Sequence, residues 1–223
     1  MTSRVAGRPK SSKSAAVSPS FRPPLPDSVA LQISARLIDE RGRLTESVLA
    51  ARAFRCAILV DLVGAGVLQN DADDVEINPS PDLLPLAERM TGDMADRSDH
   101  SLVWWAHHGG ISLKDAAGQM VDLGLWERHR DHLDLEHHYT WCDGQGDLAG
   151  RLRAATGDTY DDADHRLIAP NLAVVSGLYG RAPRPPEDAV VAGLGRSNWL
   201  VPDLLDYLWR DATLIDAGAA VLD

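Results

Sequence analysis

A seven-residue pattern that occurs twice constrains the fold of this chain more than any other feature. Residues 62–68 read LVGAGVL and residues 120–126 read MVDLGLW. In both copies an apolar helical stretch meets a glycine, Gly66 or Gly124, and two large apolar residues then lead into a polar segment. Helices often end at glycine because it adopts the left-handed backbone conformation at little cost. The repeat therefore predicts a helix followed by a short hairpin, twice, in a chain that is mainly helical.

The composition fits one soluble domain of about 200 residues, or two tightly fused units of helix plus hairpin. Hydrophobic residues make up 44% of the 223 residues, which is enough for a core. No apolar run approaches the ~20 residues that a membrane span requires. The two cysteines do not make a disulfide framework, and Cys56 lies in the apolar run 54–59, so we expect a buried thiol in a reducing cytoplasm.

Charge divides the chain into a basic tail and an acidic body. Residues 1–26 contain five Lys and Arg residues and no acid, and they are rich in Ser, Pro and Ala. Because the whole chain has a net charge of −11, residues 27–223 carry −16. We expect a disordered tail over 1–26 and a folded domain over 27–223. We expect no nucleic-acid partner, because the acidic body would repel the phosphate backbone.

The spacing of apolar residues predicts the helices of the body. A first helix, capped by Asp27 or Ser28, carries Val29, Ile33 and Leu37 on one face. Asp82 is expected to cap a later helix that follows a proline-rich break. The remaining helices are predicted over 46–63, 99–107, 112–123, 146–155, a stretch that ends near 179, 187–194 and 202–222, with hairpins over 66–77 and 126–141.

Six stretches resemble, in the same order, the Golgi phosphoprotein 3 family and in particular its shorter bacterial relatives. They are 31–44 (LQISARLIDERGRL), 54–68 (FRCAILVDLVGAGVL), 78–87 (NPSPDLLPLA), 103–105, 120–126 and 164–178 (DHRLIAPNLAVVSGL). The resemblance implies a mainly α fold, in which a helical bundle is surrounded by amphipathic helices with small β-hairpins. It also implies a non-enzymatic, cytoplasmic adaptor, peripheral on the inner face of a membrane, that binds phosphatidylinositol 4-phosphate and a protein tail or a second copy of itself.

The lipid pocket of that family uses a tryptophan, an arginine and an R-x-x-R pair. By resemblance the first arginine corresponds to Arg55, whereas the tryptophan position holds Glu46. The R-x-x-R positions hold Gly110 and Leu113, with Lys114 one residue further along. A carboxylate at position 46 repels a phosphate, so we expect weak or altered binding of anionic phospholipid headgroups.

Arg52 lies three residues before Arg55 and hence on the same side of the predicted helix. Arg55, Arg52 and Lys114 are therefore the predicted headgroup-binding residues. The alternative for the two arginines is a pair of salt bridges to acids such as Asp61 or Glu46.

Two other functional classes stay open. A helix plus a hairpin also describes a winged-helix module that binds nucleic acid or protein. Binding nucleic acid would need a basic recognition helix, whereas the 112–123 helix has one cation, Lys114, and two aspartates. The 127–141 hairpin holds four of the eight histidines, and a metal-dependent enzyme there is the third hypothesis. Its same-face residues His132, Asp134, Glu136 and His138 would be spaced by about 7 Å, too far apart to converge on one ion without a bend. We therefore expect no metal, no cofactor and no catalytic residue.

Overall fold

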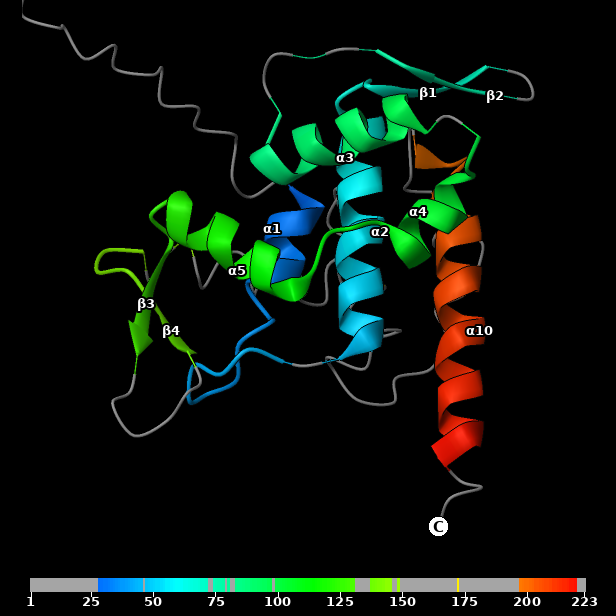
Figure 1. Ribbon diagram of the computed structural model, residues 1–223. Helices are drawn as coiled ribbons and strands as arrows, with labels where there is room; N and C mark the ends of the chain where they lie inside the picture. The colour runs from blue at the N-terminus through cyan, green and yellow to red at the C-terminus, as the bar shows by residue number, and fades with distance from the viewer. Residues whose placement is uncertain are drawn as a thin grey trace, which may run out of the picture.

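The computed structural model describes residues 28–45, 47–71, 74–78, 80, 83–97, 99–130, 137–145, 148, 172 and 197–219. In this part the chain is mainly α with two small antiparallel hairpins, which confirms the predicted class (Figure 1). The predicted tail over 1–26 and Glu46 lie outside the described residues. So do almost all residues of the helices expected over 146–155, near 179 and over 187–194.

The helix α2 (Val48–Gly64) is buried along most of its length. It begins at Ser47, whose hydroxyl accepts a hydrogen bond from the backbone N–H of Ala50 at 3.3 Å. Every side chain from Ala53 to Val60 is buried, including the thiol of Cys56 as predicted. The helices that contact α2 are α1 (Val29–Ser34), α3 (Pro85–Asp96), α4 (Leu102–His108), α5 (Leu113–Asp122) and α10 (Val201–Ala219). Figure 1 shows α2 running lengthwise between them.

The repeated pattern forms the same structure twice, as predicted. After α2, β1 (Leu68–Asp71) pairs with β2 (Asp74–Ile77), and after α5, β3 (Trp126–Arg130) pairs with β4 (His137–Trp141). Gly66 has a φ of 74° and Gly124 a φ of 67°. The residue after each glycine donates its N–H back into the last turn of the helix, Val67 to Leu62 and Leu125 to Met120, both at 2.9 Å. This is the hydrogen-bond pattern of a glycine C-cap.

The repeat extends to one residue before the pattern, where Asp61 and Gln119 correspond. Asp61 accepts hydrogen bonds from the backbone N–H groups of Val29 at 2.7 Å and Ala30 at 3.1 Å, so it caps α1 from a neighbouring helix. Gln119 Oε1 likewise accepts from the N–H of Leu86 at 3.0 Å and caps α3. The prediction that Asp82 caps this helix is wrong, because the capping position is Leu84, without a side-chain bond.

The first helix is shorter than predicted. It ends at Ser34, because the N–H groups of Arg36 and Leu37 turn back to the carbonyls of Ile33 and Ser34, both at 3.0 Å. Leu37 is nevertheless buried. The chain then reverses over 39–42, and Ile38 pairs with Leu44.

The helices α4 and α10 complete the described part. Ser101 caps α4 through the N–H of Trp104 at 3.2 Å, and α10 packs against both α4 and α2. Trp105 is buried, whereas Trp104 is half-buried and stacks on His100 with ring centroids 3.7 Å apart. Among the described residues, no helix combines the length and apolar character that crossing a bilayer would require.

Candidate functional site

Arg55, the first predicted headgroup residue, is buried and bonded to the backbone. Its Nε donates to the carbonyl of Ala106 at 2.7 Å, Nη1 to that of Ile111 at 2.9 Å and Nη2 to that of His107 at 2.8 Å. These acceptors belong to the last turn of α4 and to the link between α4 and α5, where helix geometry leaves carbonyls without intrahelical partners. Burial lowers the pKa of Arg55, but a guanidinium stays protonated in proteins.

Gly109 allows this arrangement. A Cβ atom at position 109 would lie 2.5 Å from the carbonyl oxygen of Trp105 and 3.0 Å from Cδ of Arg55. Any side chain would therefore displace Arg55 or the end of α4. Arg55 thus anchors the α4–α5 link to α2 through backbone carbonyls rather than through the salt bridge considered as its alternative role, while its contact with a headgroup stays a prediction.

Arg52, the second predicted residue, forms an ion pair with Asp211 of α10. Both side chains are mostly buried, with 13% and 18% of their surfaces exposed. The partner is neither of the acids considered from the sequence: Asp61 caps α1, and Glu46 is not described. The structure therefore places Arg52 and Arg55 on one helix but gives them separate partners.

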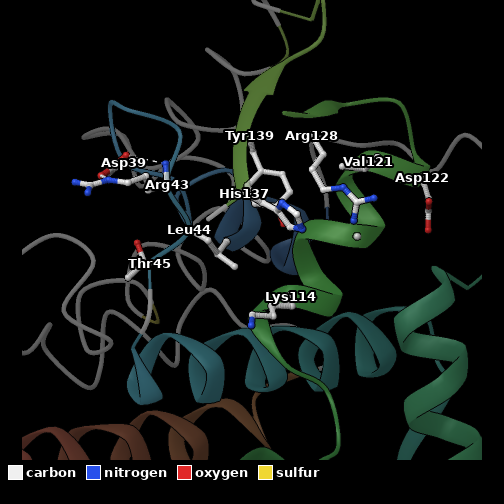
Figure 2. A pocket seen from close by; sticks show the side chains of 11 residues that line it. Asp39, Arg43, Leu44, Thr45, Lys114, Val121, Asp122, Arg128, His137 and Tyr139 are labelled. Atoms are coloured by element: carbon white, nitrogen blue, oxygen red, sulfur yellow. Dashed lines mark hydrogen bonds and ion pairs between the residues drawn. The ribbon is translucent and has the colours of Figure 1, made fainter. Parts of the chain in front are cut away.

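Lys114, the third predicted residue, lies elsewhere, on a cavity of about 740 Å³. Three segments line it: the loop 39–45, one face of α5, and the hairpin β3–β4. Figure 2 shows Lys114, Arg128 and His137 around the same opening, each from a different element. The structure does not bring Lys114 together with the two arginines of α2.

Two of the charged side chains in the loop, Asp39 and Arg43, pair with each other. Arg43 Nε lies 3.2 Å from Asp39 Oδ2, and Asp39 Oδ1 accepts from the N–H groups of Arg41 and Arg43, both at 2.8 Å. The hydrogen bond from the Arg43 backbone is the largest cause that lowers the pKa of Asp39. Desolvation opposes it, and further hydrogen bonds from the Arg41 backbone and the Arg43 side chain keep the pKa below its ordinary value. Asp39 is therefore ionised at neutral pH and paired with Arg43.

Lys114 and Arg128 have no ion pair with any residue that the structure describes. Both side chains are exposed. The other acid on the cavity, Asp122, is the last residue of α5, whereas Lys114 lies in its first turn, so roughly 12 Å of helix separates them. As far as the described residues go, these two cationic side chains have no ionic partner and can meet an anion at this opening.

The backbone around the cavity is fixed by a close approach of the loop to β4. The N–H of Tyr139 donates to the carbonyl of Gly42 at 2.8 Å, and Arg43 pairs with His138 in an isolated bridge. Gly42 has a φ of 75°, and a Cβ there would collide with the Tyr139 carbonyl. Glycine is therefore required at 42, and the loop is held against the hairpin.

Sequence reasoning identified Lys114 but missed Arg43 and Arg128. One signal was available for Arg128. It stands two residues after the second copy of the repeat, where the first copy has Asn70. The repeated unit forms with Asn70 at this position in the first copy, so the fold does not require a cation at position 128.

Most of the residues considered for a metal site belong to 131–136, which lie outside the described part. Of its four residues only His138 is described, and its Nδ1 lies 3.3 Å from the carbonyl of Arg41. Among the described residues, no group of three or more His, Cys, Asp or Glu side chains could hold a metal ion.

No known protein family matches this sequence, and no curated protein or solved structure matches it either.

Proposed function

We propose that this protein is a non-enzymatic adaptor of the Golgi phosphoprotein 3 type, which associates with anionic phospholipid on the cytoplasmic face of a membrane. The proposal includes the finer architecture, a helical bundle around α2 with amphipathic helices outside it. It also includes a protein partner, which is either the tail of another protein or a second copy of this chain. Two observations support the proposal: six sequence stretches resemble the family in the same order along the chain, and the helix–glycine–hairpin unit occurs twice.

The observation that carries the proposal is a pair of cations, Lys114 and Arg128, that line one open cavity of an acidic chain and have no ion pair within the part of the chain that the structure describes. Near an anionic bilayer each Lys or Arg contributes about 1 kcal/mol. Two such residues overcome only part of the long-range repulsion of a body with many acids, so we expect weak, salt-sensitive association.

The proposed contact differs from the family's lipid pocket. Of the positions that the resemblance maps, only Arg55 keeps its cation, and its guanidinium nitrogens donate to backbone carbonyls. We therefore propose that association depends on Lys114 and Arg128 rather than on a pocket specific for phosphatidylinositol 4-phosphate.

A vesicle flotation assay tests the proposal. Full-length protein is mixed with vesicles of phosphatidylcholine alone or of phosphatidylcholine with phosphatidylglycerol, at low and at high salt. We expect the protein to float only with the anionic vesicles and only at low salt, because salt screens exposed charges. Absence from the anionic vesicles at low salt, or equal flotation with neutral ones, would contradict the proposal.

A further inference from the structure

We propose that the cavity between the loop 39–45, α5 and the β3–β4 hairpin is a binding site for an organic phosphate ester, with Lys114 and Arg128 as its charged donors. This inference rests on the proposed function, since it names the group that the membrane surface would present. The same chemistry occurs in lipid headgroups and in soluble phosphate esters, and the experiment below separates these sources.

The two donors suit a phosphate group. Arg128 offers a planar fork of N–H donors that matches two phosphate oxygens, and Lys114 offers a compact point charge. They come from different elements, β3 and α5, so they approach the opening from two directions (Figure 2). His137 of β4 lines the same opening and adds a ring nitrogen that can donate a hydrogen bond.

The acid next to Lys114 is already committed elsewhere. Asp115 Oδ1 lies 2.9 Å from Arg89 Nη1, and Asp115 Oδ2 accepts from the backbone N–H of Ser112 at 2.8 Å. The bond from Ser112 is one half of a capping box, which the N–H of Asp115 completes by donating to Ser112 Oγ at 3.2 Å, and this box fixes the first turn of α5. Lys114 is therefore held by a rigid turn whose neighbouring carboxylate is occupied, which reduces the ordering cost of binding an anion.

The size and lining of the cavity favour an ester over an inorganic ion. Its volume of about 740 Å³ falls within the range of small-molecule sites. Besides the cations, its lining includes Leu44, Val121 and the mostly buried Tyr139. An inorganic phosphate would leave these surfaces uncovered, whereas the organic part of an ester can lie on them.

The first copy of the repeat provides an internal comparison. There a smaller hollow, of about 390 Å³, includes Val63 and Asn70, which correspond to Val121 and Arg128. None of the described residues that line this first hollow is charged. The cationic lining therefore does not follow from the helix–glycine–hairpin unit itself but belongs to the second copy.

Calorimetric titration of the full chain with glycerol 3-phosphate tests the inference, with glycerol and inorganic phosphate as comparison ligands. We expect glycerol 3-phosphate to bind more tightly than either. Lys114→Ala and Arg128→Ala should each weaken binding about tenfold or more, because each removes a charge-assisted hydrogen bond. Arg97→Ala is the matched control, since Arg97 is exposed and lies on the end of α3, away from the cavity lining. Equal thermal unfolding midpoints would establish that the variants fold.

The same variants are then tested on vesicles that contain phosphatidic acid, a monoester, or phosphatidylglycerol, a diester, at equal surface charge. If the protein prefers phosphatidic acid and both cavity variants lose this preference, the result supports a phosphate-ester site whose ligand is a lipid headgroup. Binding of glycerol 3-phosphate without recruitment to either vesicle supports the site with a soluble source and contradicts the proposed function. Recruitment to both vesicles alike, with no binding of glycerol 3-phosphate, overturns this inference and leaves the proposed function standing.

Discussion

Arg55 lies in the protein interior and meets no carboxylate in the part of the chain that the structure describes. Its guanidinium instead satisfies backbone carbonyls of Ala106, His107 and Ile111. Nothing in the sequence marks these acceptors, because every residue has a carbonyl. An arginine inside an apolar run can therefore be assigned to a ligand as readily as to the backbone, and only the three-dimensional structure separates the two roles.

We predict that Arg55→Leu lowers the free energy of unfolding by about 3 kcal/mol, because buried carbonyls lose charged donors worth roughly 1.5–3 kcal/mol each, partly offset by relaxation. Urea unfolding followed by circular dichroism measures this loss. Arg97→Leu, at an exposed position, should change the stability by less than about 0.5 kcal/mol. Equal effects of the two substitutions would show that Arg55 does not anchor the α4–α5 link.

The helix–glycine–hairpin unit is the part of the fold that the sequence predicted best. Both glycines have positive φ, and both hairpins form within the ranges predicted for them. The caps supplied by Asp61 and Gln119 were not predicted, because each acts on a helix that is remote in sequence. Local signals thus identify where a helix ends, whereas a cap from a neighbouring helix depends on packing.

Gly66→Ala and Gly124→Ala should each destabilise the protein by about 1 kcal/mol, because alanine pays a steric cost at positive φ that glycine does not. Gly118→Ala is the control. Gly118 lies inside α5, and a Cβ there meets nothing within 4 Å, so this change should stabilise by roughly 0.5–1 kcal/mol. Thermal unfolding of the three variants measures both the expected destabilisation and the expected stabilisation. Destabilisation by Gly118→Ala, or neutrality of the other two, would contradict this view of the repeat.

The capping box of α5 predicts a dependence of stability on pH. Burial alone would raise the pKa of Asp115, but hydrogen bonds from Arg89 and Ser112 outweigh it and hold that pKa below its ordinary value. A carboxyl group with a lowered pKa stabilises the folded state above its unfolded pKa of about 3.9, and this contribution disappears as the pH falls through the folded value.

Asp115→Asn should therefore lower the free energy of unfolding by about 1 kcal/mol at neutral pH, and the gap between variant and wild type should close below about pH 4. Urea unfolding at a series of pH values measures this gap. A gap that stays constant down to acidic pH would mean that the Asp115 charge does not contribute.

The cationic cavity is a product of the whole tertiary structure. A loop after α1, one face of α5 and both strands of the second hairpin meet there, so its charges are scattered along the sequence. Lys114 was predicted because it lies one residue after a position that the resemblance assigns to an arginine. Arg43 and Arg128 were not, since in sequence they belong to a turn and to a charged hairpin.

The net charge of the chain is also a poor guide to the charge around this cavity. The chain is acidic overall, yet Lys114 and Arg128 stand free of acidic partners among the described residues at one opening. A membrane or a ligand at short range meets these side chains rather than the average charge.

Vesicle flotation of charge-reversed variants tests most directly whether this cavity binds anions at a membrane. The double variant Lys114→Glu/Arg128→Glu is compared with Arg97→Glu/Arg210→Glu, which changes the net charge equally on α3 and α10. We predict that wild type and the α3/α10 variant float with vesicles of phosphatidylcholine and phosphatidylglycerol at low salt, and that the cavity variant does not. Flotation of the cavity variant at the wild-type level, or equal loss by both double variants, would contradict the assignment of anion binding to Lys114 and Arg128.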